Sequence, residues 1–425
     1  MEIKAMMDGA AIRVGGRSRL IGGGAAGLIA VLVVLLLVVS SCGGNTSSAA
    51  DERSGEKKAK PTGPSEASVT ISPDNGADGV ATTGELAVSV DEGELTEVVV
   101  RAVDGEKVPG EITDDGTVWK PAHHLRTKTT YTVDAVATDD EERKAAEHAN
   151  FSTLVPDDTF VGFFRPEEGD KVGVGMPVSI RFNRAVEEPE TVERAVSVTA
   201  DPAVDIEGHW FGDNRLDFRP EEYWEPGTEV TLRLDLDGVE GADGVYGSQH
   251  KTVTFEIGRS QVSVIDAEKK TMTVTRDGKK IKTIPVSAGA PATPTYNGTM
   301  VISEKHVVTR MNGATVGFTD GEGEGEYDIK DVPHAMRLST SGTFIHGNYW
   351  ASSATFGSVN TSHGCIGLDD ARGGWDEKAA AAWFFENSVI GDVVRVKNSR
   401  DPETIAPDNG LNGWNMSWEE WTAEQ

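Results

Sequence analysis

Residues 361–368 read Thr-Ser-His-Gly-Cys-Ile-Gly-Leu, and residues 345–348, shortly before them, read Ile-His-Gly-Asn. Cys365 is one of only two cysteines in the chain. Each of the two stretches contains a histidine that precedes Cys365, His363 in the first and His346 in the second. The thiolate is the reactive form of cysteine, and a neighbouring imidazole can generate it. The pattern therefore indicates a cysteine nucleophile, with Cys365 as the candidate.

Two histidines compete for the role of general base. His363 would share a face with Cys365 on an extended strand, whereas a sharp turn would point it elsewhere, so we favour His346 as the base. Gly364 would let backbone N–H groups of residues 363–365 face a developing oxyanion. A thiol poised by an imidazole also predicts a depressed pKa for Cys365.

Length and charge limit the classes of protein to which the chain can belong. A chain of 425 residues is too long for one ordinary core, so we expect roughly two to four domains. The net charge of −29 argues against nucleic acid as a partner, because phosphate binding needs a basic surface. The acidity is typical of a soluble protein in an exposed setting.

The first forty residues have the pattern of a targeting segment. Basic residues from Arg13 to Arg19 precede an apolar run from Ile21 to Val39, and small residues lead into Cys42. This order is typical of a secretory signal, although the apolar run is also long enough for an uncleaved membrane anchor. Residues 39–42, Val-Ser-Ser-Cys, resemble the lipobox of bacterial lipoproteins, in which the cysteine is lipidated.

We therefore favour a signal peptide over residues 1–41 and a lipid on Cys42, which places the chain outside the cytoplasm and anchored to the cell membrane. Residues 42–65 are rich in Ser, Ala, Gly, Lys and Glu, which favours a flexible linker. If Cys42 carries the lipid, Cys365 has no disulfide partner, which is unusual in an exported protein unless the thiol does chemistry.

Residues 66–258 consist of short alternating runs separated by Gly, Asp, Asn and Pro, a pattern that predicts antiparallel β-sandwiches. A weak internal repeat relates Ser-Pro-Asp-Asn-Gly at 72–76 to Arg-Pro-Glu-Glu-Gly at 165–169. The offset suits an immunoglobulin-like domain, so we expect one such domain at 66–155 and another at 156–258. The adjacent His123 and His124 are expected to be solvated, and we expect no metal site.

Residues 259–397 predict a β-rich domain of another kind. Asp277-Gly278 between two alternating runs is a strong hairpin signal, residues 375–388 favour a helix, and residues 393–396 favour a closing strand. The acidic stretch 321–326 is either a surface insert or a lid. Trp414, Trp418 and Trp421 follow the spacing of one helix face, which predicts a clasp packed on another domain over residues 398–425, with a sugar-stacking platform as the alternative.

Ser-His-Gly-Cys at 362–365, preceded by His-Gly-Asn at 346–348, resembles the signature of the YkuD-type L,D-transpeptidase catalytic domain. The order of strands, hairpin, histidine segment and cysteine turn over residues 259–397 is similar throughout. The whole chain resembles the lipoprotein members of this family, which carry two immunoglobulin-like domains and a Trp-rich C-terminal tail. The implied fold is mainly β, with one main helix in the catalytic domain.

The resemblance implies that Cys365 attacks the third residue of a peptidoglycan tetrapeptide stem, releases the terminal D-alanine and forms a thioester. An amine of a second stem would then resolve the thioester into a 3→3 cross-link. His346 matches the catalytic histidine of the family and Gly364 its glycine, with Ser362 and His363 at supporting positions. We expect no cofactor, and carbapenems are expected to acylate the thiol.

Other site positions match the family less closely. Tyr327, Gly347 and Asn348 are candidate substrate-binding residues, with Phe318 as a second candidate lid aromatic. Gly347 stands where the family often has Ser, and Gly367 where it usually has Asn or Arg. The segment at 373–374, Gly-Gly, looks like an insertion. Two alternatives stay open at this point: an L,D-carboxypeptidase that trims stems with water, and a non-catalytic cell-wall-binding lipoprotein.

Overall fold

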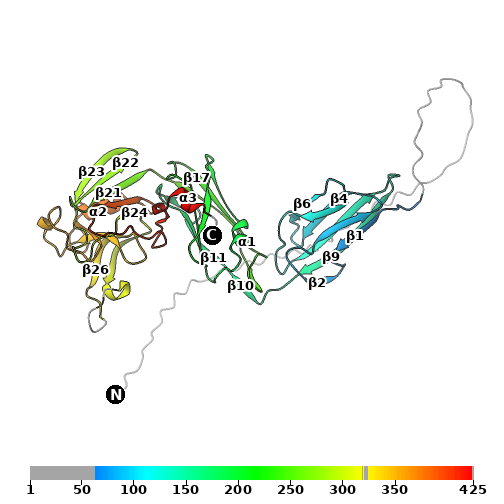
Figure 1. Ribbon diagram of the computed structural model, residues 1–425, viewed down its shortest axis with the longest axis horizontal. Helices are drawn as coiled ribbons and strands as arrows, with labels where there is room; N and C mark the ends of the chain where they lie inside the picture. Colours follow the sequence, from blue (N-terminus) through cyan, green and yellow to red (C-terminus); the bar gives the residue numbers. More distant parts are fainter. Residues whose placement is uncertain (1–62, 318, 320–323, 424–425) are drawn as a thin grey trace, which may run out of the picture. The chain divides into compact units, whose positions relative to one another are not determined.

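A computed structural model describes residues 63–317, 319 and 324–423 (Figure 1). The predicted signal peptide, the lipidation of Cys42, most of the predicted linker and Phe318 lie outside these described residues. Within the described ranges, none of the helices has the length and apolarity needed to cross a membrane.

The first part of the described chain folds into two sheets that enclose a core of their own. Its strands are β1 (Ser68–Ser72), β2 (Ala77–Val80), β3 (Ala87–Asp91), β4 (Glu94–Ala102), β5 (Lys107–Val108), β6 (Gly110–Ile112), β7 (Val118–Pro121), β8 (Thr130–Thr138) and β9 (Lys144–Thr153). The sheet orders are β1-β3-β7-β6 and β2-β9-β8-β4-β5. Alternate residues of β8 are buried, as the period-two pattern predicts, and they pack around Trp119 and Phe151.

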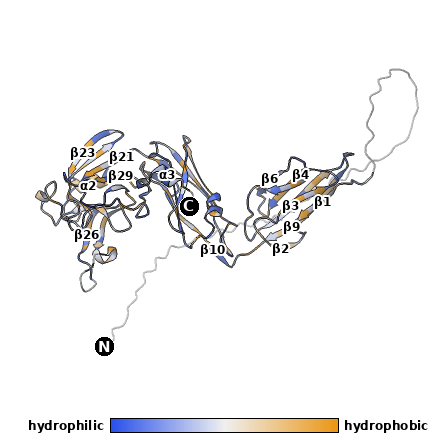
Figure 2. Cartoon of the chain, in the orientation of Figure 1, coloured by the Kyte–Doolittle hydropathy of each residue, from blue (hydrophilic) through white to orange (hydrophobic). Residues whose placement is uncertain are grey.

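The next part is also built mainly of strands, in three sheets, and has a core of its own. Its elements are β10 (Asp158–Phe160), β11 (Gly162–Arg165), β12 (Lys171–Val172), β13 (Val178–Phe182), α1 (Pro189–Arg194), β14 (Val196–Asp201), β15 (Glu207–Trp210), β16 (Arg215–Arg219), β17 (Glu229–Asp235), β18 (Glu240–Ala242), β19 (Val245–Gly247) and β20 (His250–Ile257). The sheet orders are β10-β19-β18, β11-β13-β16-β15 and β12-β20-β17-β14. Hydrophobic residues concentrate on the strands in Figure 2, and the buried ones form a separate cluster around Trp224. The mainly β architecture is confirmed.

The C-terminal part contains the stretch with which the sequence analysis began. Its strands are β21 (Gln261–Asp266), β22 (Thr271–Arg276), β23 (Lys279–Pro285), β24 (Gly298–Val301), β25 (Glu304–Asn312), β26 (Asp328–Arg337), β27 (Phe344–Asn348), β28 (Ile366–Asp369) and β29 (Val393–Lys397). Its helical elements are η1 (Gly313–Val316), η2 (Ser353–Thr355), α2 (Ala380–Glu386), η3 (Gly413–Asn415) and α3 (Trp418–Trp421). The two sheets run β23-β22-β21-β29-β24 and β25-β26-β27-β28, and one core of aliphatic and aromatic residues joins them to α2.

The predicted hairpin and closing strand are confirmed. Asp277 and Gly278 join β22 to β23, and both have positive φ, at 47° and 74°. This is the backbone that a two-residue hairpin turn requires and that Asp-Gly supplies at little cost. The closing strand is β29, which lies between β21 and β24.

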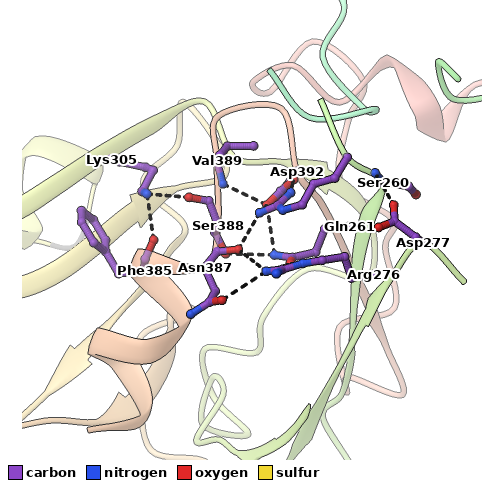
Figure 3. Close-up of polar contacts among 11 residues, drawn as sticks. Ser260, Gln261, Arg276, Asp277, Lys305, Phe385, Asn387, Ser388, Val389 and Asp392 are labelled. Atoms are coloured by element: carbon purple, nitrogen blue, oxygen red, sulfur yellow. Dashed lines mark hydrogen bonds and ion pairs between the residues drawn. The ribbon is translucent and has the colours of Figure 1, made fainter. Parts of the chain in front are cut away.

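The predicted helix at 375–388 is shorter than expected, since α2 covers only Ala380–Glu386. Its C-terminal end is the negative end of the helix dipole, and cations from both sheets cap it (Figure 3). Lys305 of β25 donates to the carbonyls of Phe385 and Ser388, and Arg276 of β22 donates to the carbonyl of Asn387. The caps hold α2 against β26, β27 and β28, the strands that build the site.

The tail is a clasp, but it is not the continuous helix that the tryptophan spacing predicts. It breaks at Met416 between η3 and α3. The guanidinium of the buried Arg219 in β16 lies 4.8, 5.4 and 4.3 Å from the ring centroids of Trp414, Trp418 and Trp421. A cation stacked among aromatic faces explains the spacing without helical periodicity.

Candidate active site

Parallel pairing of β27 with β28 brings the two motifs together. Ile345 pairs with Ile366 and His346 with Gly367, and Cys365 immediately precedes β28. Paired residues, and residues two apart along a strand, point to the same face of a sheet. His346 and Cys365 therefore lie on one face, and Gly367 presents no side chain between them.

Both side chains open into one cavity of about 190 Å³. The candidate residues on its wall are His346, Asn348, Ser362, His363, Cys365 and Tyr327, and the others are Met311, Ile329, Trp350 and Thr361. Gly347 and Gly364 are not among the lining residues. Met311 and Ile329 come from β25 and β26, and no motif in the sequence points to them.

The hydrogen bond of His346 defines its tautomer. His346 is 4 % exposed, and its Nδ1 lies 2.9 Å from the carbonyl oxygen of Gly347. A carbonyl only accepts, so Nδ1 carries the proton and Nε2 keeps its lone pair. Burial lowers the pKa of His346, which favours the neutral imidazole, and the ring stacks on Trp350 at 5.6 Å between centroids. A neutral imidazole with a free lone pair is what a general base requires.

The pKa of Cys365 differs from the one that the sequence predicts. Its Sγ donates to the carbonyl oxygen of Gly342 at 3.5 Å. Burial raises the pKa of Cys365 to about 11, and the nearby backbone N–H of Phe344 opposes this only in part. The prediction of a depressed pKa is therefore wrong. The reason is that the thiol is withdrawn from water, which penalises the thiolate. The raised pKa of the thiol and the lowered pKa of the imidazole both favour the uncharged forms, so proton transfer has to accompany attack.

The raised pKa of Cys365 predicts how the reactivity of the thiol depends on pH. Below the raised pKa of Cys365, the thiolate fraction grows about tenfold per pH unit. Alkylation by iodoacetamide should therefore accelerate steadily from pH 7 to pH 10. Mass spectrometry of the modified chain over time measures the rate. A plateau reached near pH 6 or 7 would instead show a preformed thiolate–imidazolium pair and would contradict the neutral pair.

Ser362 and Gly364 shape the turn that presents the sulfur. The Ser362 hydroxyl donates to the carbonyl of Cys365 at 2.5 Å and accepts from the Gly364 N–H at 3.2 Å. Thr295 donates to the Gly364 carbonyl at 2.8 Å, and Gly364 has φ of +112°. The Gly364 N–H is thus used inside the turn. It does not face the cavity, in contrast to the predicted role as an oxyanion donor. Ser362 therefore stabilises the turn through these two hydrogen bonds.

Gly364→Ala isolates the backbone requirement of the turn. A Cβ at Gly364 would find no atom nearer than the Pro294 carbonyl oxygen, 3.8 Å away, so a steric clash contributes nothing. The φ value alone should lower the free energy of unfolding by about 1–3 kcal/mol and displace the thiol. Urea unfolding and the iodoacetamide rate measure the two effects. Unchanged stability would contradict the strain.

His363 contacts the end of the acidic segment. Its Nε2 lies 3.3 Å from Glu326 Oε2, and its ring centroid lies 5.2 Å from that of Tyr327. Burial raises the pKa of Tyr327 to about 12, with the neighbouring Cys365 contributing in the same direction. The described end of the acidic stretch, Glu326, therefore lies beside the wall of the cavity. In the described ranges, no group of three His, Cys, Asp or Glu side chains is placed to hold a metal ion.

Comparisons with known proteins match two parts of the chain to known families. Residues 260–396 match the family model for the L,D-transpeptidase catalytic domain (YkuD), and residues 77–240 match the model for a bacterial Ig domain (Big_10). The second match runs through both β-sandwiches, so their assignment as two immunoglobulin-like domains stays a prediction.

Curated relatives extend the similarity to most of the chain. It is 30 % identical over 355 residues to L,D-transpeptidase 2 of Mycobacterium tuberculosis, which covers 84 % of each chain. It is 29 % identical over 374 residues to L,D-transpeptidase 5 of the same species, which covers 86 % of this chain and 79 % of the relative. A solved structure of the L,D-transpeptidase LdtMt1 in complex with imipenem is 28 % identical and covers 57 % of this chain and 100 % of its own, with a TM-score of 0.47. The chain belongs to the L,D-transpeptidase family.

Proposed function

We propose that the chain is a peptidoglycan L,D-transpeptidase that uses Cys365 as its nucleophile and His346 as its base. Nε2 of His346 takes the thiol proton while Sγ attacks the carbonyl of the third residue of a donor tetrapeptide stem. The imidazolium returns the proton to the leaving amine, and D-alanine departs. The stem stays on Cys365 as a thioester.

The second half of the reaction reverses the proton flow. The side-chain amine of an acceptor stem attacks the thioester, and His346 takes a proton from that amine and returns it to the departing sulfur. The product is a 3→3 cross-link and the free thiol. One observation carries this assignment: Cys365 and His346 line the same cavity from one sheet face, with Nδ1 held by Gly347.

Water in place of the acceptor amine would make the chain an L,D-carboxypeptidase. Incubation of the compact unit Pro61–Gln425 with a disaccharide-tetrapeptide separates the outcomes by mass spectrometry. A dimer lacking one D-alanine is the expected product. A tripeptide alone would replace the assignment by stem trimming, and unchanged substrate would leave a cell-wall-binding protein.

Carbapenems are proposed as acylating inhibitors of the same thiol. A carbapenem carries a strained cyclic amide, whose carbonyl presents to Cys365 the same target as the stem peptide. Attack opens the ring, so no group has to leave, and the intact mass should rise by the full mass of imipenem. Modification at a residue other than Cys365 would oppose the proposal.

The anchor is proposed from the sequence alone. A lipid on Cys42 would tether the enzyme to the outer face of the cell membrane, towards the cell wall. The Arg-rich start, the apolar run and the Ser-Ser-Cys sequence support this placement. Labelling with a clickable palmitate analogue should mark the full-length chain and not its Cys42→Ala variant. Equal labelling of both would oppose lipidation at this residue.

A further inference from the structure

The glycine that follows the base is required by a neighbouring carboxylate. A Cβ built on Gly347 would lie 2.0 Å from Oδ2 of Asp370 and 2.8 Å from its Cβ and Cγ. No real side chain tolerates such a distance. Asp370 therefore occupies the space in which a residue other than glycine at 347 would place its side chain.

Asp370 is held in that space by a buried partner. Its Oδ2 lies 2.8 Å from Nδ1 of His334, and its Oδ1 accepts from the N–H of Ala371 at 2.8 Å. The exposed fractions of the two side chains are 7 % for His334 and 0 % for Asp370. A carboxylate so far from water stays there only when its oxygens are bonded, so His334 is what keeps Asp370 over Gly347.

His334 reaches Asp370 through an unusual backbone. It has φ of +50°, which is rare for a residue that is not glycine. The ladder between β26 and β27 ends at the pair of Met336 with Ile345, before it would reach His334. On the other side, a Cβ at Gly374 would lie 2.9 Å from Cε1 of His334. The absence of a side chain at Gly374 therefore leaves room for the imidazole of His334.

Gly347 links the contacts of Asp370 and His334 to the base, His346. Gly347 faces the Asp370 carboxylate at its Cα, and its carbonyl accepts the Nδ1 proton of His346. Displacement of Gly347 would move that carbonyl and release the tautomer that leaves Nε2 free. We propose that Asp370 and His334 are positioning residues that clamp Gly347 and so hold His346 as the general base. This inference rests on the proposed function.

The contact of Gly347 with Asp370 can be tested by a double-variant cycle in Pro61–Gln425, with imipenem as the acylating probe. Gly347→Ala adds only the clashing Cβ and should slow acylation of Cys365 by about 10- to 100-fold. Asp370→Gly removes the carboxylate and its Cβ and should slow acylation by about tenfold. The double variant should match Asp370→Gly, because the three nearest neighbours of the added Cβ, all atoms of the Asp370 side chain, are then gone. A neutral Gly347→Ala, or losses that multiply in the double variant, would overturn the clamp.

The role of His334 is tested by a conservative pair of variants. Asn tolerates positive φ and keeps a side-chain N–H donor, so His334→Asn should retain acylation within about threefold of the wild type. His334→Ala loses the donor and should match Asp370→Gly. The control is His306→Ala, since His306 of the adjacent strand β25 also pairs with a carboxylate, Glu304 at 3.0 Å, but stays partly exposed. Melting temperatures recorded beside the rates separate positioning from unfolding. Equal rates in the Asn and Ala variants would contradict the role.

Iodoacetamide distinguishes failure of the clamp from failure of the proposed function. Alkylation depends on the sulfur and its base and needs no substrate. If the wild type forms no thioester with stem or imipenem while the clamp variants alter the pH–rate profile of alkylation, the proposed function fails and the clamp stands. If all variants form the thioester at the wild-type rate, the clamp fails and the function stands.

Discussion

Cys365→Ser is expected to lower 3→3 dimer formation from disaccharide-tetrapeptide by at least about 10³-fold, and to abolish the acyl-enzyme. A hydroxyl is a far weaker nucleophile than a thiol at neutral pH, because its proton is much harder to remove. The structure offers no second thiol, since Cys365 is the one free cysteine among the described residues. Mass spectrometry of the intact chain and of the released products measures both losses.

The loss has to be separated from misfolding. Ser differs from Cys by one atom, and the Sγ contact that it replaces is a long hydrogen bond to the Gly342 carbonyl. The unfolding transition should therefore be close to that of the wild type. His306→Ala serves as the matched surface control and should retain full activity. Dimer formation by a folded Cys365→Ser chain at more than about a tenth of the wild-type rate would remove the sulfur from the mechanism.

Trp421→Ala is expected to lower the free energy of unfolding by about 3–5 kcal/mol. Trp421 is 1 % exposed, stacks on His209 at 4.9 Å and donates from Nε1 to the Glu207 carbonyl at 3.0 Å. It also covers the Arg219 guanidinium, whose burial lowers the pKa of that group to about 10. Truncation leaves a cavity beside a buried cation that has lost one of its aromatic faces.

Urea unfolding followed by far-UV circular dichroism measures this change. Trp375→Ala is the matched control because Trp375 is 76 % exposed, so its truncation should alter the unfolding free energy by less than about 0.5 kcal/mol. A loss below about 1 kcal/mol in Trp421→Ala would mean that the tail packs loosely and that the clasp is not part of the stable fold.

Much of the fold follows from local patterns, because period-two burial and turn chemistry act over a few residues. The alternation in β8 and the Asp-Gly turn between β22 and β23 are of this kind. The tryptophan spacing of the tail fails as a helix signal for the opposite reason. Its cause is Arg219, which lies in another part of the chain and cannot be recognised from periodicity.

That Cys365 and His346 would meet at one site could be predicted because the motif residues come from two short stretches with distinctive chemistry. Their protonation could not, because the raised pKa of Cys365 and the lowered pKa of His346 both come from burial by residues distant in sequence. The spacing of the motif residues alone predicted a lowered pKa for the Cys365 thiol, whereas burial raises it.

The sequence by itself determined the β-rich class and the family, and it singled out Cys365 and His346 as the proposed nucleophile and base, since each depends on residue type and short-range order. Only the tertiary structure decided the neutral state of the catalytic pair, the role of Ser362 in bracing the turn, and the reason for glycine at 347. In each case the deciding contact joins residues through space, as Asp370 and His334 do at Gly347. Desolvation and steric exclusion arise only when such residues pack together, so no stretch of chain carries them alone.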